Sequence, residues 1–162
     1  QTGKRLEVSV DDPLLEQPMG AFVTLHKNGR LRGCIGHMAA EGPLYLTVRD
    51  MAIASASQDW RFPPVSREEL DDIDIEISAL SPMRKVEDYH QIQTGKHGVM
   101  VRMGPRSGVY LPQVADETGW DREQFMNSLC SSKAGIPSDA WKTGDADIYL
   151  FTAEVFGEKE FE

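Results

Sequence analysis

Cys34 is the residue whose type and neighbours are best suited to chemistry. It lies in the stretch L-R-G-C-I-G-H at residues 31–37, with Arg32 two positions before it and glycines at 33 and 36. A reactive thiol needs a nearby cation or a helix N-terminus to lower its pKa. Residues two apart in a strand share a face, which would place Arg32 beside Cys34. The alternative is an inert packing residue, because free cysteine is among the most buried residue types.

A second candidate segment, D-W-R-F-P-P at residues 59–64, is stiffened by two prolines. Such a loop could present Arg61 to a carboxylate or phosphate group, which guanidinium recognises through paired hydrogen bonds. In the alternative interpretation, Phe62 fills the core and Arg61 pairs with Asp59. The sequence leaves both interpretations open.

Two weaker candidates follow further along the chain. His97, in G-K-H-G, begins an expected strand and could serve as a base. It could equally be a loop histidine hydrogen-bonded to backbone. Gln113 follows a proline and could donate a hydrogen bond to a ligand. Nothing in the sequence shows that His97 meets Cys34.

Composition limits the classes of function. The 162 residues are enough for one ordinary domain or two small interlocked ones, and the net charge of −9 makes general nucleic-acid binding unfavourable. No apolar run approaches the roughly 20 residues of a membrane-spanning helix. Two distant cysteines are more typical of a reducing cytosol than of a disulfide scaffold. Zinc motifs of the CxxC or HExxH type and calcium loops are absent from the sequence, so we predict no metal site and name no cofactor.

The elements that must position these residues can be predicted from local patterns. Asn28-Gly29, between two runs rich in β-formers, predicts a hairpin that places Cys34 near the end of its second strand. A helix is expected over 43–57, with Pro43 in its first turn. Strict alternation over 73–80 predicts a half-buried strand.

In the second half of the chain, the pattern predicts a further hairpin over 99–111. A helix is expected from Asp121, as N-cap, to about residue 132, with Gly135 as its stop signal. One final strand is expected over 148–156. Hairpins with helices between them predict an α+β fold with a mainly antiparallel sheet.

Taken in order, many motifs resemble those of the AMMECR domain family, named for a chromosomal region of Alport syndrome with intellectual disability, midface hypoplasia and elliptocytosis. They are G-A-F-V-T-L, L-R-G-C-I-G, D-W-R-F-P-P, G-K-H-G-V, R-S-G-V-Y-L-P-Q-V-A, G-W-D-x-E-x-F and the closing Y-L-F-x-A-E-V-F. The resemblance covers about residues 20–156.

The resemblance implies an α+β fold of two intimately joined lobes and no established reaction. It also implies that the family's hallmark segment, R-G-C-I-G, is the functional site. This segment falls on Arg32, Gly33, Cys34, Ile35 and Gly36. Prokaryotic members are often associated with Memo-like proteins, which are relatives of extradiol dioxygenases, and with radical-SAM-like proteins. Members commonly carry an N-terminal helix, so we expect residues 1–162 to form a single domain that lacks part of its N-terminal portion.

The leading hypothesis is a cytoplasmic protein that binds a small molecule or acts as a cysteine-dependent enzyme. Cys34 would be the nucleophile and His97 the acid or base, while Arg32 and Arg61 would lower the thiol pKa and hold an anionic group. The substrate-binding set predicted from these motifs is Arg32, Gly33, Gly36, Asp59, Arg61 and Gln113.

The alternative is a non-catalytic binding or scaffold module that acts with a Memo-like or radical-SAM-like partner. Neither hypothesis includes direct nucleic-acid or membrane binding. The sequence leaves the oligomeric state open, with a homodimer among the alternatives.

Overall fold

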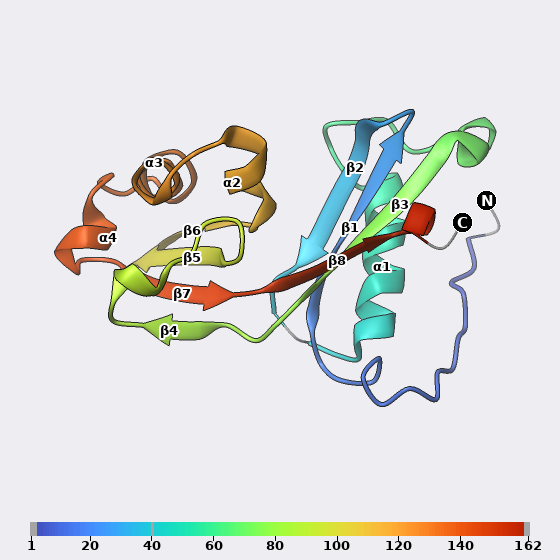
Figure 1. Cartoon of the computed structure of the whole chain (residues 1–162). Helices are drawn as coiled ribbons and strands as arrows, with labels where there is room; N and C mark the ends of the chain where they lie inside the picture. The colour runs from blue at the N-terminus through green and yellow to red at the C-terminus, as the bar shows by residue number, and fades with distance from the viewer. Residues whose placement is uncertain (1–2, 40, 161–162) are drawn as a thin grey trace. The chain divides into compact units, whose positions relative to one another are not determined.

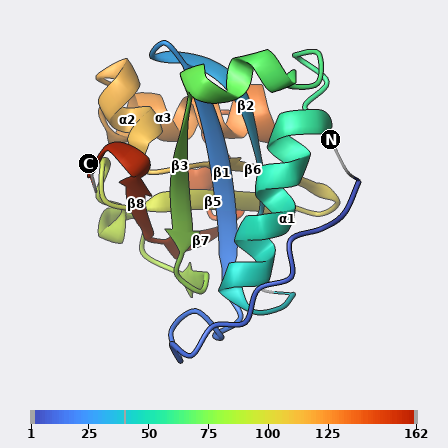
Figure 2. The same ribbon diagram turned by 90° about the vertical axis from the view of Figure 1, so that its right-hand side faces the viewer.

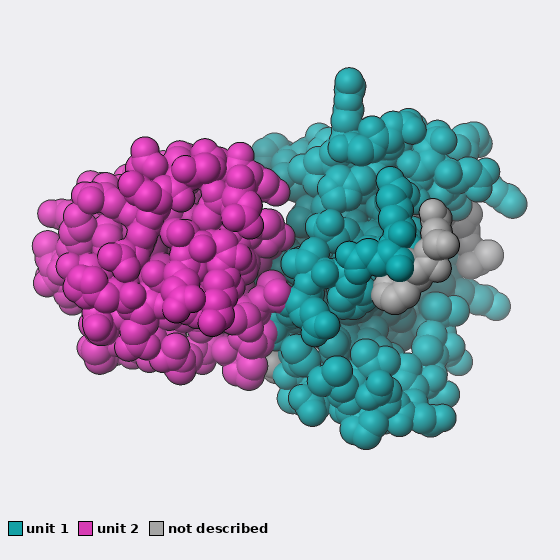
Figure 3. All heavy atoms as spheres, viewed as in Figure 1, with its two compact units in different colours: residues 1–80, 154–162 teal, residues 81–153 magenta. Residues whose placement is uncertain are grey.

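The computed structural model describes residues 3–39 and 41–160 (Figure 1). The chain divides into two compact units (Figure 3). The first contains residues 1–80 and 154–162, and the second contains residues 81–153. Within the described ranges, no helix combines the length and apolar character needed to cross a membrane.

The first unit is a four-stranded sheet in the order β2-β1-β3-β8. The strands are β1 (Gly20–Lys27), β2 (Arg30–His37), β3 (Ile73–Leu80) and β8 (Ala153–Gly157). Helix α1 (Leu44–Ser57) runs along one face of this sheet (Figure 2). Alternate residues of β1, with Val23 fully buried, point to that face and form the core. The opposite face therefore carries the side chains of Thr24 and its neighbours two positions away.

The hairpin that joins β1 and β2 confirms the prediction from Asn28-Gly29. Both residues have positive φ, 51° and 75°, as a type I′ turn requires. Thr24 pairs with Cys34 in the antiparallel ladder, but the register shifts between Leu25 and His26 and passes over Arg32. This irregularity interrupts the simple alternation from which Arg32 was expected beside Cys34.

Helix α1 begins one residue after the expected position, with Pro43 as its N-cap. Its chain then continues through the D-W-R-F-P-P loop into a short 3-10 helix, η1 (Arg67–Asp72), which leads into β3. Strand β3 covers the predicted range 73–80.

The second unit is a four-stranded sheet in the order β4-β7-β5-β6. Its strands are β4 (Arg84–Val86), β5 (Gly98–Met103), β6 (Arg106–Tyr110) and β7 (Asp147–Phe151). Its helical segments are η2 (Tyr89–Gln91), α2 (Gln113–Thr118), α3 (Arg122–Ser128), the π-helical η3 (Leu129–Ala134) and α4 (Ala140–Thr143). Phe125, Met126 and Leu129 are fully buried in the core of this unit.

Two expectations for the second half need revision. The single strand expected over 148–156 is two strands, β7 and β8, which belong to different sheets. They part at Thr152, whose N–H donates to Ser81 Oγ at 2.8 Å and whose carbonyl accepts from Ser81 N–H at 2.9 Å. The helix expected to about residue 132 is α3 followed by π-helical η3. The predicted Asp121 N-cap and the left-handed Gly135 stop are confirmed. Two antiparallel sheets with several helices confirm the α+β class.

Candidate functional site

Cys34 lies on β2, at the edge of the first sheet, and its side chain is half-buried. Its N–H donates to Asp59 Oδ2 at 2.9 Å, and its carbonyl accepts from Arg61 Nη2 at 3.4 Å. The D-W-R-F-P-P loop therefore caps the open edge of β2 at this residue. On the sheet face, the Thr24 hydroxyl donates to Cys34 Sγ at 3.2 Å.

Asp59 holds the loop together as well as the strand edge. Its carboxylate also accepts from Arg61 N–H at 3.1 Å, Nε at 2.9 Å and Nη2 at 2.7 Å. The Arg61 guanidinium and the backbone N–H of Cys34 together hold the pKa of Asp59 well below its usual range, despite burial. The hydrogen bonds that Arg61 donates to Asp59 also raise the pKa of Arg61. Arg61 thus pairs with Asp59, yet 41% of its side chain stays exposed.

Arg32 is bound to a residue that sequence reasoning did not place in the site. Its Nε and Nη2 donate to the two carboxylate oxygens of Glu69 at 3.0 and 2.9 Å. Lys27 Nζ adds a third bond to Glu69 at 3.0 Å. Hydrogen bonding from Arg32 is the main cause that holds the pKa of Glu69 well below its usual range. The only signal in the sequence was Ser66-x-x-Glu69. This capping pattern predicts where a helical turn begins, but it does not predict that Glu69 binds Arg32.

The two glycines of the R-G-C-I-G segment meet close neighbours on opposite faces. A Cβ at Gly33 would lie 2.3 Å from the carbonyl oxygen of Ser55 in α1, and one at Gly36 would lie 2.3 Å from the Phe22 ring. The Ser55 hydroxyl also accepts from Ile35 N–H at 2.8 Å. The same hydroxyl donates to the backbone carbonyl of β1 beneath it, at residue 23. Both glycines therefore permit close packing around Cys34.

His97 and Gln113 belong to the second unit, whereas Arg32, Cys34, Asp59 and Arg61 belong to the first. His97 Nδ1 accepts a hydrogen bond from Gln93 N–H at 3.1 Å, as in the backbone-bonded alternative. Burial is the main cause that lowers the pKa of His97, which favours the neutral ring. Gln113 Oε1 is buried and has no hydrogen-bond partner among the described residues.

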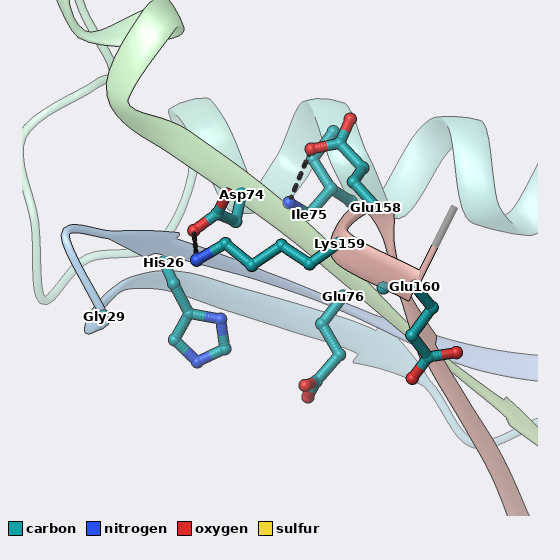
Figure 4. Close-up of a pocket in the computed structure, with 9 residues that line it drawn as sticks. His26, Gly29, Asp74, Ile75, Glu76, Glu158, Lys159 and Glu160 are labelled. Carbon is teal, nitrogen blue, oxygen red and sulfur yellow. Dashed lines mark hydrogen bonds and ion pairs between the residues drawn. The ribbon is translucent and has the colours of Figure 1, made fainter. Parts of the chain in front are cut away.

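A separate cavity of about 320 Å³ lies where β3 meets the turn that follows β8 (Figure 4). Lys159 Nζ pairs with Asp74 across it at 2.6 Å, and Glu158 accepts from the N–H of Ile75 at 3.1 Å. None of the predicted site residues lines this cavity. Over the described ranges, the structure contains no group of three or more His, Cys, Asp or Glu side chains arranged to hold a metal ion.

The sequence model of the AMMECR1 domain matches residues 1–156. The chain belongs to the AMMECR1 family. It is similar to protein MK0488 of Methanopyrus kandleri, with 42% identity over 99% of this chain and 81% of the relative. It is also similar to a protein of Methanothermobacter thermautotrophicus, with 44% identity over 96% of this chain and 84% of the relative.

Among solved structures, the chain matches the crystal structure of the uncharacterised protein PH0010 from Pyrococcus horikoshii. The TM-score is 0.87 at 42% sequence identity, over 97% of this chain and 82% of that chain. The family membership predicted from the motifs is confirmed, and so is the fold. These AMMECR1 relatives carry no named reaction.

Proposed function

We propose that this AMMECR1 domain binds a small molecule at β2 and acts through the Cys34 thiol. Cys34 would serve as a nucleophile, or as the thiol that contacts the ligand. Arg61 would hold an anionic group of that ligand, because its side-chain bonds to Asp59 and Cys34 use Nε and Nη2, and no residue in the described part of the chain binds Nη1. Arg32, engaged by Glu69, would support the strand and not the ligand.

The observation that carries the proposal is the difference between Cys34 and the other residues of its motif. Arg32 binds Glu69, Gly33 and Gly36 admit close neighbours, and Ile35 is tied to α1 through its N–H. The Cys34 side chain instead lies half-buried on a sheet face, with a hydroxyl donor on its sulfur. A residue kept only for packing needs no such donor.

The predicted roles of His97 as acid or base and of Gln113 as a ligand donor remain part of the hypothesis. They belong to a different unit from Cys34, and the thiol chemistry at β2 can be tested without them. A reducing, cytoplasmic setting would keep Cys34 as the free thiol that the proposal needs.

Alkylation of the folded protein tests the proposal. We would use a Cys130→Ala background, because Cys130 is the second thiol and is fully buried. Iodoacetamide forms an S–C bond with the Cys34 thiolate, releases iodide and leaves the proton to solvent. We expect one label per folded chain, absent from a Cys34→Ser control. Labelling that appears only when the chain unfolds would contradict the proposal.

A second candidate function, the scaffold module, is favoured by Trp60. This side chain is 91% exposed although it lies between Asp59 and Arg61 in the stiffened loop. Exposed tryptophans are frequent anchors of protein interfaces. Under this proposal, a Memo-like or radical-SAM-like partner covers Trp60, and Cys34 is not required.

Sedimentation with the Memo-like protein of the same organism separates the two candidates. A complex that forms with wild type and Cys34→Ser but not with Trp60→Ala would support the scaffold. Alanine substitution of an anchor tryptophan typically weakens binding by 2 kcal/mol or more, which is roughly thirtyfold. Absence of any complex, together with a reactive Cys34, would support the thiol function instead.

A further inference from the structure

We propose that Thr24 is the positioning residue of the Cys34 thiol. Its hydroxyl holds the sulfur and stabilises the thiolate form. This inference rests on the proposed function, because it concerns the state of the thiol that would act there. It assigns a role to a residue on the neighbouring strand, outside the R-G-C-I-G motif and outside the predicted site.

The hydrogen bonds of Cys34 show which kind of strand pair it forms with Thr24. Its N–H and carbonyl both bind the 59–61 loop, so they point away from β1. Thr24 and Cys34 are therefore a non-hydrogen-bonded pair of the antiparallel ladder. In such pairs the Cα atoms are only about 4.5 Å apart and the side chains lie closest. The bond from Thr24 Oγ1 to Cys34 Sγ follows from this register.

A competing acceptor lies on the other side of Thr24. Glu76 of β3 is its partner in the adjoining ladder, and a carboxylate is normally the stronger acceptor. However, strand β1 lies between β2 and β3, and the N–H and carbonyl of one residue point to the same neighbour. Those of Thr24 do not bind β2, so they point toward β3. Thr24 and Glu76 are thus a hydrogen-bonded pair, with Cα atoms about 5.5 Å apart. The sulfur is the nearer acceptor, and the hydroxyl binds it.

Two further features keep this donor in place. Threonine is β-branched, so its χ1 angle is restricted and the hydroxyl is already aimed at its acceptor. On the same face, the Phe22 ring occupies the space above Gly36, the residue two positions after Cys34. The sulfur therefore has Thr24 opposite it, on the face that also carries the Phe22 ring. A hydrogen bond donated to the charged form of an acid favours that form, so the Thr24 hydroxyl favours the thiolate.

The test measures iodoacetamide labelling of Cys34 against pH in the Cys130→Ala background. Thr24→Val removes the hydroxyl and keeps the shape, and Thr24→Ser restores a donor. Thr47→Val is the matched control, because the Thr47 hydroxyl binds a helix carbonyl in the same unit, 3.3 Å from Pro43 O. Circular dichroism establishes that each variant is folded. If Thr24→Val does not fold, Thr24→Ala replaces it.

We expect Thr24→Val to move the midpoint of the rate profile upward by about one pH unit, which is about a tenfold slower reaction at pH 7. Thr24→Ser should return the profile to that of wild type, and Thr47→Val should leave it unchanged. A wild-type profile in folded Thr24→Val would overturn the role of Thr24 and leave the thiol function standing. A wild-type Cys34 that does not react while folded would overturn both.

Discussion

Among single residues, Asp59 connects groups that the sequence keeps apart. Its carboxylate accepts from the N–H of Cys34, 25 positions earlier, and from the main chain and guanidinium of Arg61. The side chain of Asp59 is 4% exposed. A buried carboxylate with this many donors fixes both the edge of β2 and the orientation of Arg61.

Replacement of Asp59 by Asn should therefore destabilise the first unit. The variant keeps the shape but loses the charge that binds Arg61, and we expect a loss of about 1–3 kcal/mol at pH 7. The pKa of Asp59 is lowered in the folded chain, so its contribution is complete above the ordinary value of 3.8 and declines as the pH falls below it. Urea unfolding of wild type and Asp59→Asn at pH 7 and pH 3 measures the contribution of Asp59 to the free energy of unfolding.

The difference in free energy of unfolding between wild type and Asp59→Asn should be smaller at pH 3 than at pH 7, because pH 3 lies below the ordinary pKa of 3.8. Asp71→Asn, at an exposed position in η1, is the control and should change stability little at either pH. An equal difference at both pH values would show that the Asp59 charge is not what stabilises the loop.

Residue types were easier to predict than their partners. Pairing of Asp59 with Arg61 spans two positions and was one of two interpretations available from the sequence. Pairing of Arg32 with Glu69 spans 37 positions. It depends on the register shift in β2 and on where η1 ends, and neither is visible in local patterns. The candidate thiol was therefore identifiable from the sequence, and its electrostatic surroundings were not.

At the scale of elements, strand β2 depends on its glycines. A Cβ at Gly36 would lie 2.3 Å from the Phe22 ring and 2.6 Å from the carbonyl oxygen of Ala21. We expect Gly36→Ala to destabilise the first unit by about 1–3 kcal/mol through overpacking. Gly42→Ala is the matched control, because among the described residues, apart from its two chain neighbours, no atom lies within 4 Å of a Cβ there.

Chemical denaturation compares the two variants with wild type. A Gly36→Ala protein as stable as Gly42→Ala would show that the ring can move aside without cost. Glycine would then be required at position 36 for some reason other than packing.

The contact of α1 with the first sheet gives a second prediction at this scale. Ser55 is 2% exposed, and its hydroxyl accepts from Ile35 N–H and donates to the carbonyl of Val23. Ser55→Ala would leave both backbone groups without this partner, at a cost of about 1–3 kcal/mol. Ser57→Ala, whose exposed hydroxyl binds Ile53 O, should cost less. The midpoints of thermal unfolding compare the two, and equal shifts would contradict the role of Ser55.

Elements with strong local signals were predicted well. Asn28-Gly29 is typical of a turn with positive φ, and the alternation over 73–80 is typical of a half-buried strand. The structure confirms both the turn and the strand. The short segments β4, α2 and α4 carry too few residues for a periodic pattern. The division at Thr152 depends on Ser81, which lies 71 positions earlier, so the run 148–156 looked continuous.

For the molecule as a whole, each unit holds one cysteine, so thiol labelling reports on the two units separately. Cys130 is fully buried, and burial raises its pKa to about 11. At pH 8 its thiol stays protonated as well as covered, so we expect labelling at least about a hundredfold slower than at Cys34. Mass spectrometry of digested, alkylated protein measures both rates.

Met126 lies in the core of the second unit, and Met126→Ala should lower the free energy of unfolding by about 2–5 kcal/mol. Openings of that unit then become more frequent, so we expect Cys130 to be labelled tenfold faster or more. Wild-type labelling of Cys130 at the rate of Cys34 would contradict the placement of Cys130 in the core.

The return of β8 to the first sheet has a consequence for biosynthesis. A ribosome releases residues 1–80 first, yet the fourth strand of their sheet lies at residues 153–157. Residues 81–153 form a contiguous unit and can fold as soon as they emerge, as contiguous domains generally do. Until β8 follows, β3 presents an unpaired edge, which is the kind of surface through which nascent chains aggregate. The vectorial order of synthesis thus makes the first sheet dependent on β8, and ribosome-stalled chains that end before residue 153 are where chaperone demand should be greatest.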